Sequence, residues 1–294
     1  MRVTPRTTIL ATSAFLFGMA AAGSGTLGAA WEPIARLITL QDPPRPASAN
    51  VLSEHEIEGL DGMSPQAQAT LLLERSINHY RGANEQIAAR VASWRGQVKL
   101  DDRLNNLFVT AINSDDLTVR IAGIEIDIAA RDVDKSPATV DRLEPTARLG
   151  DQGPRVNAMW DLALIGNRGV DQDRIAEILL AGIHDSNVNI RYWAVEGLAY
   201  LATDRTIDPL LQIFHDDPAP QIRERAACGL AQSGMFSAAQ RRRAVPRLLD
   251  YAEDGALDAQ TRGWVYQALR DITGASLPHE PEAWWKWVAQ HHSI

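Results

Sequence analysis

From residue 51 onward, apolar positions recur three or four residues apart, and no segment alternates apolar and polar residues as a half-buried strand does. This spacing is typical of helices that bury one face. It predicts a succession of helices separated by short turns. Five of them are expected to be the first helix of a pair, at 103–111, 140–149, 173–182, 207–214 and 242–252.

A second set of five helices carries an internal repeat, which aligns on an arginine. The arginines are Arg120, Arg155, Arg191, Arg223 and Arg262, at spacings of 35, 36, 32 and 39 residues. Three residues after each arginine the side chain is small or medium-sized, and seven residues after it four of the five repeats have leucine. Those offsets share one helix face, so the repeat predicts stacked helix pairs. The first repeat differs, because Asp127 occupies the leucine position.

An aspartate precedes each of these arginines. The five aspartates are Asp116, Asp151, Asp185, Asp217 and Asp258. Aspartate at a helix start can cap free N–H groups and suits the helix dipole, whereas arginine in the first turn opposes that dipole. The recurrence of arginine therefore predicts a structural Asp–Arg ladder, in which each guanidinium bonds carboxylates of its own and the adjacent repeat.

An aspartate followed by V/I-R-x-x-A-x-x-x-L, within paired antiparallel helices, resembles HEAT repeats, which are related to armadillo and to phycobilin-lyase-type HEAT-like repeats. The resemblance covers residues 101–275 and is to bacterial exported proteins. It implies an all-α fold, a right-handed α-solenoid of about five HEAT-like helix pairs. For function it implies protein binding, because such solenoids serve mostly as scaffolds.

Two segments that lack the arginine signature flank the repeats. Residues 51–100 are expected to form a helical N-terminal cap, in which Ser64 caps a helix. Residues 276–294 are expected to form a C-terminal capping helix with three tryptophans within 284–287. Because the end of a solenoid exposes apolar surface, these tryptophans are interpreted as its cover.

Residues 1–30 have the pattern of a secretory signal peptide. Arg2 and Arg6 precede an apolar stretch, and small residues follow it. Cleavage after Ala30 is favoured; the alternative is an uncleaved N-terminal anchor, since the stretch almost reaches the roughly 20 residues that span a bilayer. Residues 31–50 are predicted to form a Pro-rich linker. The expected location is the periplasm or cell envelope, or the membrane if the anchor is retained.

The composition excludes several classes of protein. The chain has 294 residues, of which 45% are hydrophobic, so it is not wholly disordered. Its single cysteine excludes a disulfide framework and any multi-cysteine metal site within the chain. The formal charge is −8, and loss of the two signal arginines changes it to −10 (27 basic residues minus 37 acidic ones). This acidic balance argues against a nucleic-acid partner.

Residues with catalytic or metal-binding chemistry are few. Two His-Glu pairs, His55-Glu56 and His279-Glu280, are similar to the pairs that HEAT-fold di-iron hydroxylases use, but both lie outside the five repeats. No general base accompanies Cys228 locally. We therefore predict no metal site, no cofactor and no catalytic residue.

The clearest functional candidate is a row of large side chains on the arginine helices. Offsets from each arginine place them on the face that points away from the paired helix, and the resemblance to HEAT repeats implies that this face lies on the concave side of the solenoid. They are Trp160, Tyr192, Trp193, Glu196, Trp264 and Gln267. Aromatic residues are over-represented at binding hot spots, so the row predicts a partner-binding surface. The alternative is that one or more of the rings pack between repeats.

These features predict a non-enzymatic scaffold for protein–protein interaction, exported to the cell envelope. One alternative is a HEAT-like lyase-type enzyme or chromophore-attachment factor, for which Glu196 and Asp161 are the inner acids to test. Another is a membrane-tethered adaptor with an uncleaved N-terminal anchor. The sequence identifies neither the partner protein nor the oligomeric state.

Overall fold

The structure is a computed structural model that describes residues 50–291. The predicted signal peptide, and all of the predicted linker except Asn50, lie outside the described residues. Within the described part every regular element is helical, apart from one isolated bridge between Val51 and Arg81. This confirms the predicted all-α fold.

Five helix pairs follow three N-terminal helices, α2 (Glu54–Leu60), α3 (Pro65–Ile77) and α4 (Ala83–Trp94). In each pair an outer helix precedes an inner helix that carries the signature arginine. The pairs are α5 (Asp102–Ile112) with α6 (Leu117–Ala130), α7 (Pro137–Leu149) with α8 (Gln152–Asn167), α9 (Gln172–Gly182) with α10 (Val188–Leu201), α11 (Ile207–Asp216) with α12 (Pro220–Cys228), and α14 (Val245–Glu253) with α15 (Ala259–Thr273). The remaining elements are the 3-10 turn η1 (Asp204–Thr206), the π turn η2 (Gly229–Ser233), α13 (Ala238–Arg242) and α16 (Pro281–Gln290).

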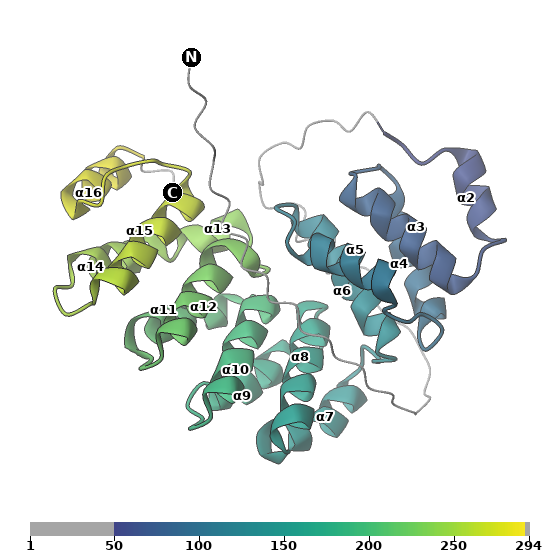
Figure 1. Ribbon diagram of the computed structural model, residues 1–294, viewed down its shortest axis with the longest axis horizontal. Helices are drawn as coiled ribbons and strands as arrows, with labels where there is room; N and C mark the ends of the chain where they lie inside the picture. Colours follow the sequence, from purple (N-terminus) through teal and green to yellow (C-terminus); the bar gives the residue numbers. More distant parts are fainter. Residues whose placement is uncertain (1–49, 292–294) are drawn as a thin grey trace.

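The pairs from α7 to α15 stack in an arc, which we call the solenoid (Figure 1). The outer helices α7, α9, α11 and α14 lie on its convex side, and the inner helices α8, α10, α12 and α15 lie on its concave side. Successive inner helices pack against one another, most extensively α8 and α10. Helices α2 to α6, which we call the N-terminal unit, lie beside α8 at one end of the arc (Figure 1).

Several helices begin where the sequence supplies a capping side chain. Ser64 accepts a hydrogen bond from the backbone N–H of Ala67 at the start of α3, with Pro65 as the first helical residue. Ser237 and Gln240 form a reciprocal capping box at the start of α13. These side chains satisfy N–H groups that have no partner within the helix, so the chain enters each helix at a defined residue.

The repeated small and leucine positions of the inner helices form the core of the solenoid. Both positions are almost fully buried in the last four repeats, at Ala158 and Leu162, Ala194 and Leu198, Ala226 and Leu230, and Val265 and Leu269. One glycine is required for the close packing of these helices. A Cβ atom at Gly229 would lie 2.7 Å from the Cβ of Ala199, so only glycine lets η2 approach α10 this closely.

Helix α6 departs from the other inner helices because it is buried on every side. Ile124 and Ile128 belong to the core shared with the solenoid, while Val119 and Ile126 belong to the core of the N-terminal unit. Asp127 has no exposed surface. The leucine position of the first repeat therefore holds an aspartate because it lies at an interface rather than in a core.

The C-terminal helix α16 packs against α14 at the end of the solenoid. Trp284 is fully buried and donates its indole N–H to the carbonyl oxygen of Pro278 at 2.9 Å. Trp285 is 37% exposed and donates to Glu253, and Trp287 stacks on His291. The expectation that all three tryptophans cover the solenoid end is therefore too broad, because successive residues of a helix point in different directions and only Trp284 is enclosed.

None of the helices between residues 50 and 291 combines the length and the apolar character that crossing a membrane requires.

Candidate functional site

The Asp–Arg motif is built into the turn between the two helices of each repeat. Every signature arginine donates to a carbonyl oxygen of the turn or helix end that precedes its own inner helix. The acceptors are Ser114 for Arg120, Ala147 for Arg155, Asp185 for Arg191, Asp217 for Arg223 and Leu257 for Arg262. The arginine therefore holds the turn in shape, since otherwise these carbonyl groups would lack a strong donor.

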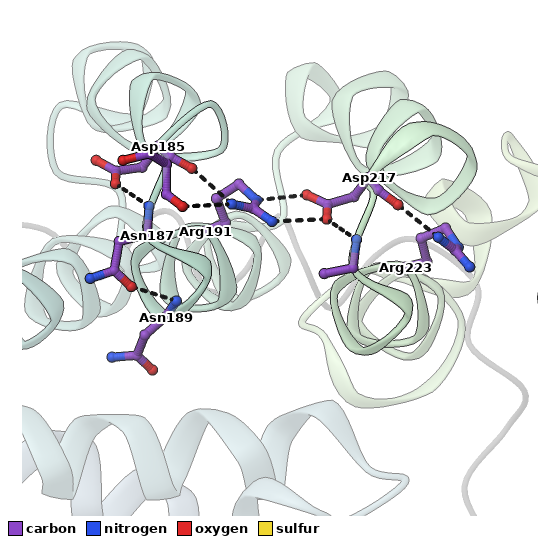
Figure 2. A network of polar contacts seen from close by, with 8 residues as sticks. Asp185, Asn187, Asn189, Arg191, Asp217 and Arg223 are labelled. Carbon is purple, nitrogen blue, oxygen red and sulfur yellow. Dashed lines mark hydrogen bonds and ion pairs between the residues drawn. The ribbon is translucent and has the colours of Figure 1, made fainter.

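Three of the arginines also bind the aspartate of the following repeat. Arg191 makes a bidentate contact with both carboxylate oxygens of Asp217, at 2.9 and 3.2 Å (Figure 2). The carbonyl oxygen of the same Asp217 accepts a bond from Arg223, so the contacts continue from repeat to repeat (Figure 2). The other two contacts are Arg155 to Asp185, at 2.7 Å, and Arg223 to Asp258, at 2.8 Å.

The ladder differs from the expectation in two respects. Within its own repeat each arginine binds a backbone carbonyl rather than a carboxylate, because the aspartate side chain turns to backbone N–H groups, as Asp185 does toward Asn187. Arg120 does not bind Asp151 either. Its Nη1 donates instead to the carbonyl oxygen of Gly234, at 2.6 Å, because α6 leans across the concave side toward the fourth repeat. Asp116, the aspartate of the first repeat, caps α6 through Thr118.

Trp160, the first member of the predicted partner surface, is only 8% exposed. Its indole N–H donates to Asp127 of α6 at 3.1 Å. Its ring meets Trp193 and Tyr200 edge to face, with centroids 6.0 and 4.7 Å apart. The prediction of an exposed ridge is therefore wrong for Trp160, because the N-terminal unit covers this part of α8.

Tyr192, Trp193 and Trp264 are partly buried and partly exposed. Tyr192 and Trp193 meet edge to face on α10, with centroids 5.9 Å apart, and burial raises the pKa of the Tyr192 hydroxyl. Trp264 of α15 packs its inner part against the core of the solenoid. These three rings therefore have one apolar part in the core and another that water can reach.

The two polar members of the predicted surface take part in ion pairs or hydrogen bonds. Glu196 of α10 is paired with Arg225 of α12. Gln267 is exposed and donates to Asp271 at 2.7 Å. Arg225 and Asp271 were not predicted from the sequence. Arg225 lies on α12, next to the helix that carries Glu196, and Asp271 lies on α15 together with Gln267. The structure thus joins Trp160, Tyr192 and Trp193 in one cluster and places Trp264 and Gln267 two repeats further along.

Asp161 of the inner helix α8 is an acid whose pKa is strongly raised. Burial raises its pKa to about 6, Arg131 opposes this change, and the nearby Asp127 adds to it. The guanidinium of Arg131, the residue after α6, lies 3.7 Å from Asp161, and the buried Oδ1 atom of Asp161 accepts no hydrogen bond from the described residues. A carboxyl group in such surroundings can exchange a proton near neutral pH. Arg131 went unnoticed in the sequence because it lies just past the end of its helix.

The described residues contain no group of three or more His, Cys, Asp or Glu side chains that could hold a metal ion. Cys228 is half-buried, and burial raises the pKa of its thiol.

Residues 140–231 match a family described as HEAT repeats, and this range runs from α7 into η2, across the second, third and fourth helix pairs. Comparison with curated proteins and with solved structures gave no match.

Proposed function

The chain is a HEAT-repeat protein, and we propose that it is a non-enzymatic scaffold that binds a partner protein on the concave side of α10, α12 and α15. One observation carries this proposal. Tyr192, Trp193 and Trp264 lie on the inner helices α10 and α15 and remain partly exposed while they are anchored in the core. An anchored ring can bury more apolar surface on binding at little cost in side-chain entropy.

The surroundings of these rings support protein binding. The Glu196–Arg225 pair lies between α10 and α12, and Gln267 and Asp271 lie on α15. Apolar rings flanked by polar groups are the usual composition of a protein interface, in which the polar rim supplies specificity. The proposed surface excludes Trp160, since the N-terminal unit covers it.

The lyase-type alternative has less support, because each of its two candidate acids already has an arginine partner. Glu196 forms an ion pair with Arg225, and Asp161 lies 3.7 Å from Arg131 and near Asp127.

The test is affinity purification of the tagged full chain from its native cells, with quantitative mass spectrometry. A double variant, Tyr192→Ala with Trp264→Ala, is expected to lose proteins that the parent enriches. Trp285→Ala is the matched control, because Trp285 is an exposed tryptophan on the capping helix and outside the proposed surface. Circular dichroism must show the same melting temperature for parent and variants.

Identical protein sets for the parent and the double variant would contradict the proposal. So would the recovery of small molecules alone, with no enriched protein. If the double variant unfolds, then the rings act in packing, and the surface interpretation is wrong.

We further propose that the protein is exported to the cell envelope. The support for this is the basic start, apolar stretch and small-residue end of residues 1–30. Mass spectrometry of the protein from its native cells tests it: a mature chain that begins near Trp31 is expected. An intact Met1 would contradict cleavage and would favour the membrane-tethered adaptor.

A further inference from the structure

The N-terminal unit meets the solenoid along α6, where Ile124 and Ile128 join the apolar core of the solenoid and buried polar side chains make further contacts. Arg120 donates to the carbonyl oxygen of Gly234, which lies 114 residues further along the chain. Glu125 accepts a bond from Arg168 at 2.8 Å, and the two side chains are only 7% and 5% exposed. Interfaces held by buried polar pairs gain little net free energy, because each charged group loses its hydration.

Direct packing between the two bodies is limited. The contact between α6 and α8 is less extensive than any other contact between successive inner helices. The connection between the bodies is the short segment 131–136, in which Asp132 has a φ of 53°. Arg95 at the end of α4 binds Asp132 at 3.2 Å, which ties this segment to the N-terminal unit, while Val133 lies in the core shared with the solenoid. A relative motion of the two bodies would bend this segment, which ends where α7 begins at Pro137.

Asp161 lies where α6, α7 and α8 meet, and it makes the interface sensitive to ionisation. The charged groups that face it are Asp127 of α6, Arg131 directly after α6 and Arg142 of α7. Arg131 is 3.7 Å away, which is beyond hydrogen-bond distance, and Oδ1 is buried without a hydrogen bond. The Asp161 side chain is 16% exposed, but an ionised carboxylate in this position has no hydrogen-bond donor at Oδ1 to compensate the lost hydration of that atom. Water would supply those donors if α6 moved away.

We propose that the N-terminal unit is a lid on the concave side of the solenoid, held closed when Asp161 is protonated and released when Asp161 is ionised. Opening uncovers Trp160 and Tyr200, which extend the aromatic surface of Tyr192 and Trp193. The lid is a property of the free chain, so it goes beyond the scaffold function and stands or falls without a partner.

The direction of the pH dependence follows from linkage. In the closed form burial raises the pKa of Asp161 to about 6, whereas an open, hydrated aspartate has the ordinary value of 3.8. The closed form therefore binds the proton more tightly, and closure weakens as the pH rises from the open value to the closed value. Between about pH 5 and about pH 7.5 the ratio of closed to open molecules is expected to fall about tenfold.

The test is double electron–electron resonance on the full chain with two spin labels. Asn106→Cys on α5 and Ala239→Cys on α13 place the labels on exposed positions of the two bodies, in a Cys228→Ser background. A longer distance is expected to gain population at the higher pH, with the tenfold change in ratio. A single distance that does not change between the two pH values would overturn the proposal.

Two variants distinguish Asp161 from other acids. Asp161→Asn is expected to stay closed at both pH values. Asp271→Asn is the matched control: Asp271 is another half-buried carboxyl group of an inner helix, burial also raises its pKa, and its hydrogen bonds go to Gln232 and Gln267 rather than to α6. The pH dependence must persist in Asp271→Asn, and its persistence in Asp161→Asn or its loss in Asp271→Asn would overturn the proposal.

Arg120→Ala provides a second, independent readout. Loss of the contact with Gly234 is expected to increase the open fraction at both pH values and to leave the tenfold pH effect in place. Unchanged distances in this variant, with helicity intact by circular dichroism, would show that the Arg120 contact does not hold the lid.

Discussion

The solenoid and the N-terminal unit carry the same Asp–Arg motif in different surroundings. In the solenoid, Arg155, Arg191 and Arg223 each bind the aspartate of the next repeat, so the turns along one edge are cross-linked. In the N-terminal unit, Arg120 occupies the same position, but it is 3% exposed and binds a backbone carbonyl of the fourth repeat.

The difference shows that the motif specifies a donor and not its acceptor. In every repeat the guanidinium first satisfies a carbonyl group of its own turn, which is a local contact. The remaining N–H groups bind whichever acceptor the packing of the helices brings near. Where repeats stack regularly this is the next aspartate, and where α6 leans over the concave side it is Gly234.

The largest loss of stability is expected from removing the most buried of the Asp–Arg contacts between repeats. Arg191 and Asp217 are 12% and 6% exposed, so Arg191→Ala leaves a buried carboxylate without its partner. We expect a loss of about 3 kcal/mol in the free energy of unfolding, measured by urea denaturation at neutral pH.

Two further variants sharpen this result. Arg223→Ala should cost clearly less, because its partner Asp258 is 52% exposed and water can replace the lost contact. In a double-mutant cycle, Arg191→Ala and Asp217→Ala together should cost less than the sum of the single changes. Additive losses would mean that the two side chains do not interact in solution.

The helix pairs could be predicted from the sequence because their motif repeats. The arginines at 120 to 262, with the small and leucine positions that follow them, predict the helix pairs and their buried faces, and residues 140–231 match HEAT repeats. Asp127 marked the first repeat as different. No local pattern could indicate that α6 covers Trp160, since that contact depends on how two bodies sit together and joins residues 33 positions apart.

The candidate surface was predictable only in part, for the same reason. Offsets from an arginine indicate which side chains point away from the paired helix, and they identified Tyr192, Trp193 and Trp264. Offsets cannot indicate whether another element covers those side chains. The ion-pair partners Arg225 and Arg131 could not be predicted from the sequence either, because a contact between two helices depends on how close they lie in space.

A smaller effect is expected from a histidine that links the fourth and fifth repeats. His215 contacts Asp216 at 2.5 Å and Asp254 at 2.8 Å. Burial lowers its pKa, but the hydrogen bonds to Asp216 and Asp254 outweigh this and raise the pKa above the ordinary value of 6.5. The folded state therefore binds the proton more tightly than the unfolded state does. This stabilisation is fully present below pH 6.5 and is lost as the pH rises through the folded pKa.

His215→Gln should remove this pH dependence while leaving the rest of the stability profile in place. Because His215 is a quarter exposed, the change should be at most about 1 kcal/mol. The measurement is the free energy of unfolding between about pH 6 and about pH 8. The pH dependence of the His215 contact has the same sign as that of the lid, since both contacts weaken as the pH rises. The lid responds in a lower pH range. If the parent protein gained stability over this pH range and His215→Gln removed that gain, the raised pKa of His215 would be contradicted.

The smallest effect on stability is expected at Asp151, the aspartate that the arginine of the preceding repeat does not bind. Asp151 is exposed and is not bound by Arg120, so Asp151→Ala should change the free energy of unfolding by less than about 0.5 kcal/mol. Asp185→Ala is the matched control at the same position of the next repeat, and it should cost about 1 kcal/mol because it removes acceptors for Arg155 and for the N–H of Asn187. Equal losses in the two variants would mean that Arg120 binds Asp151 in solution. The N-terminal unit would then stack as one more regular repeat, and its contact with Gly234 could not hold a lid.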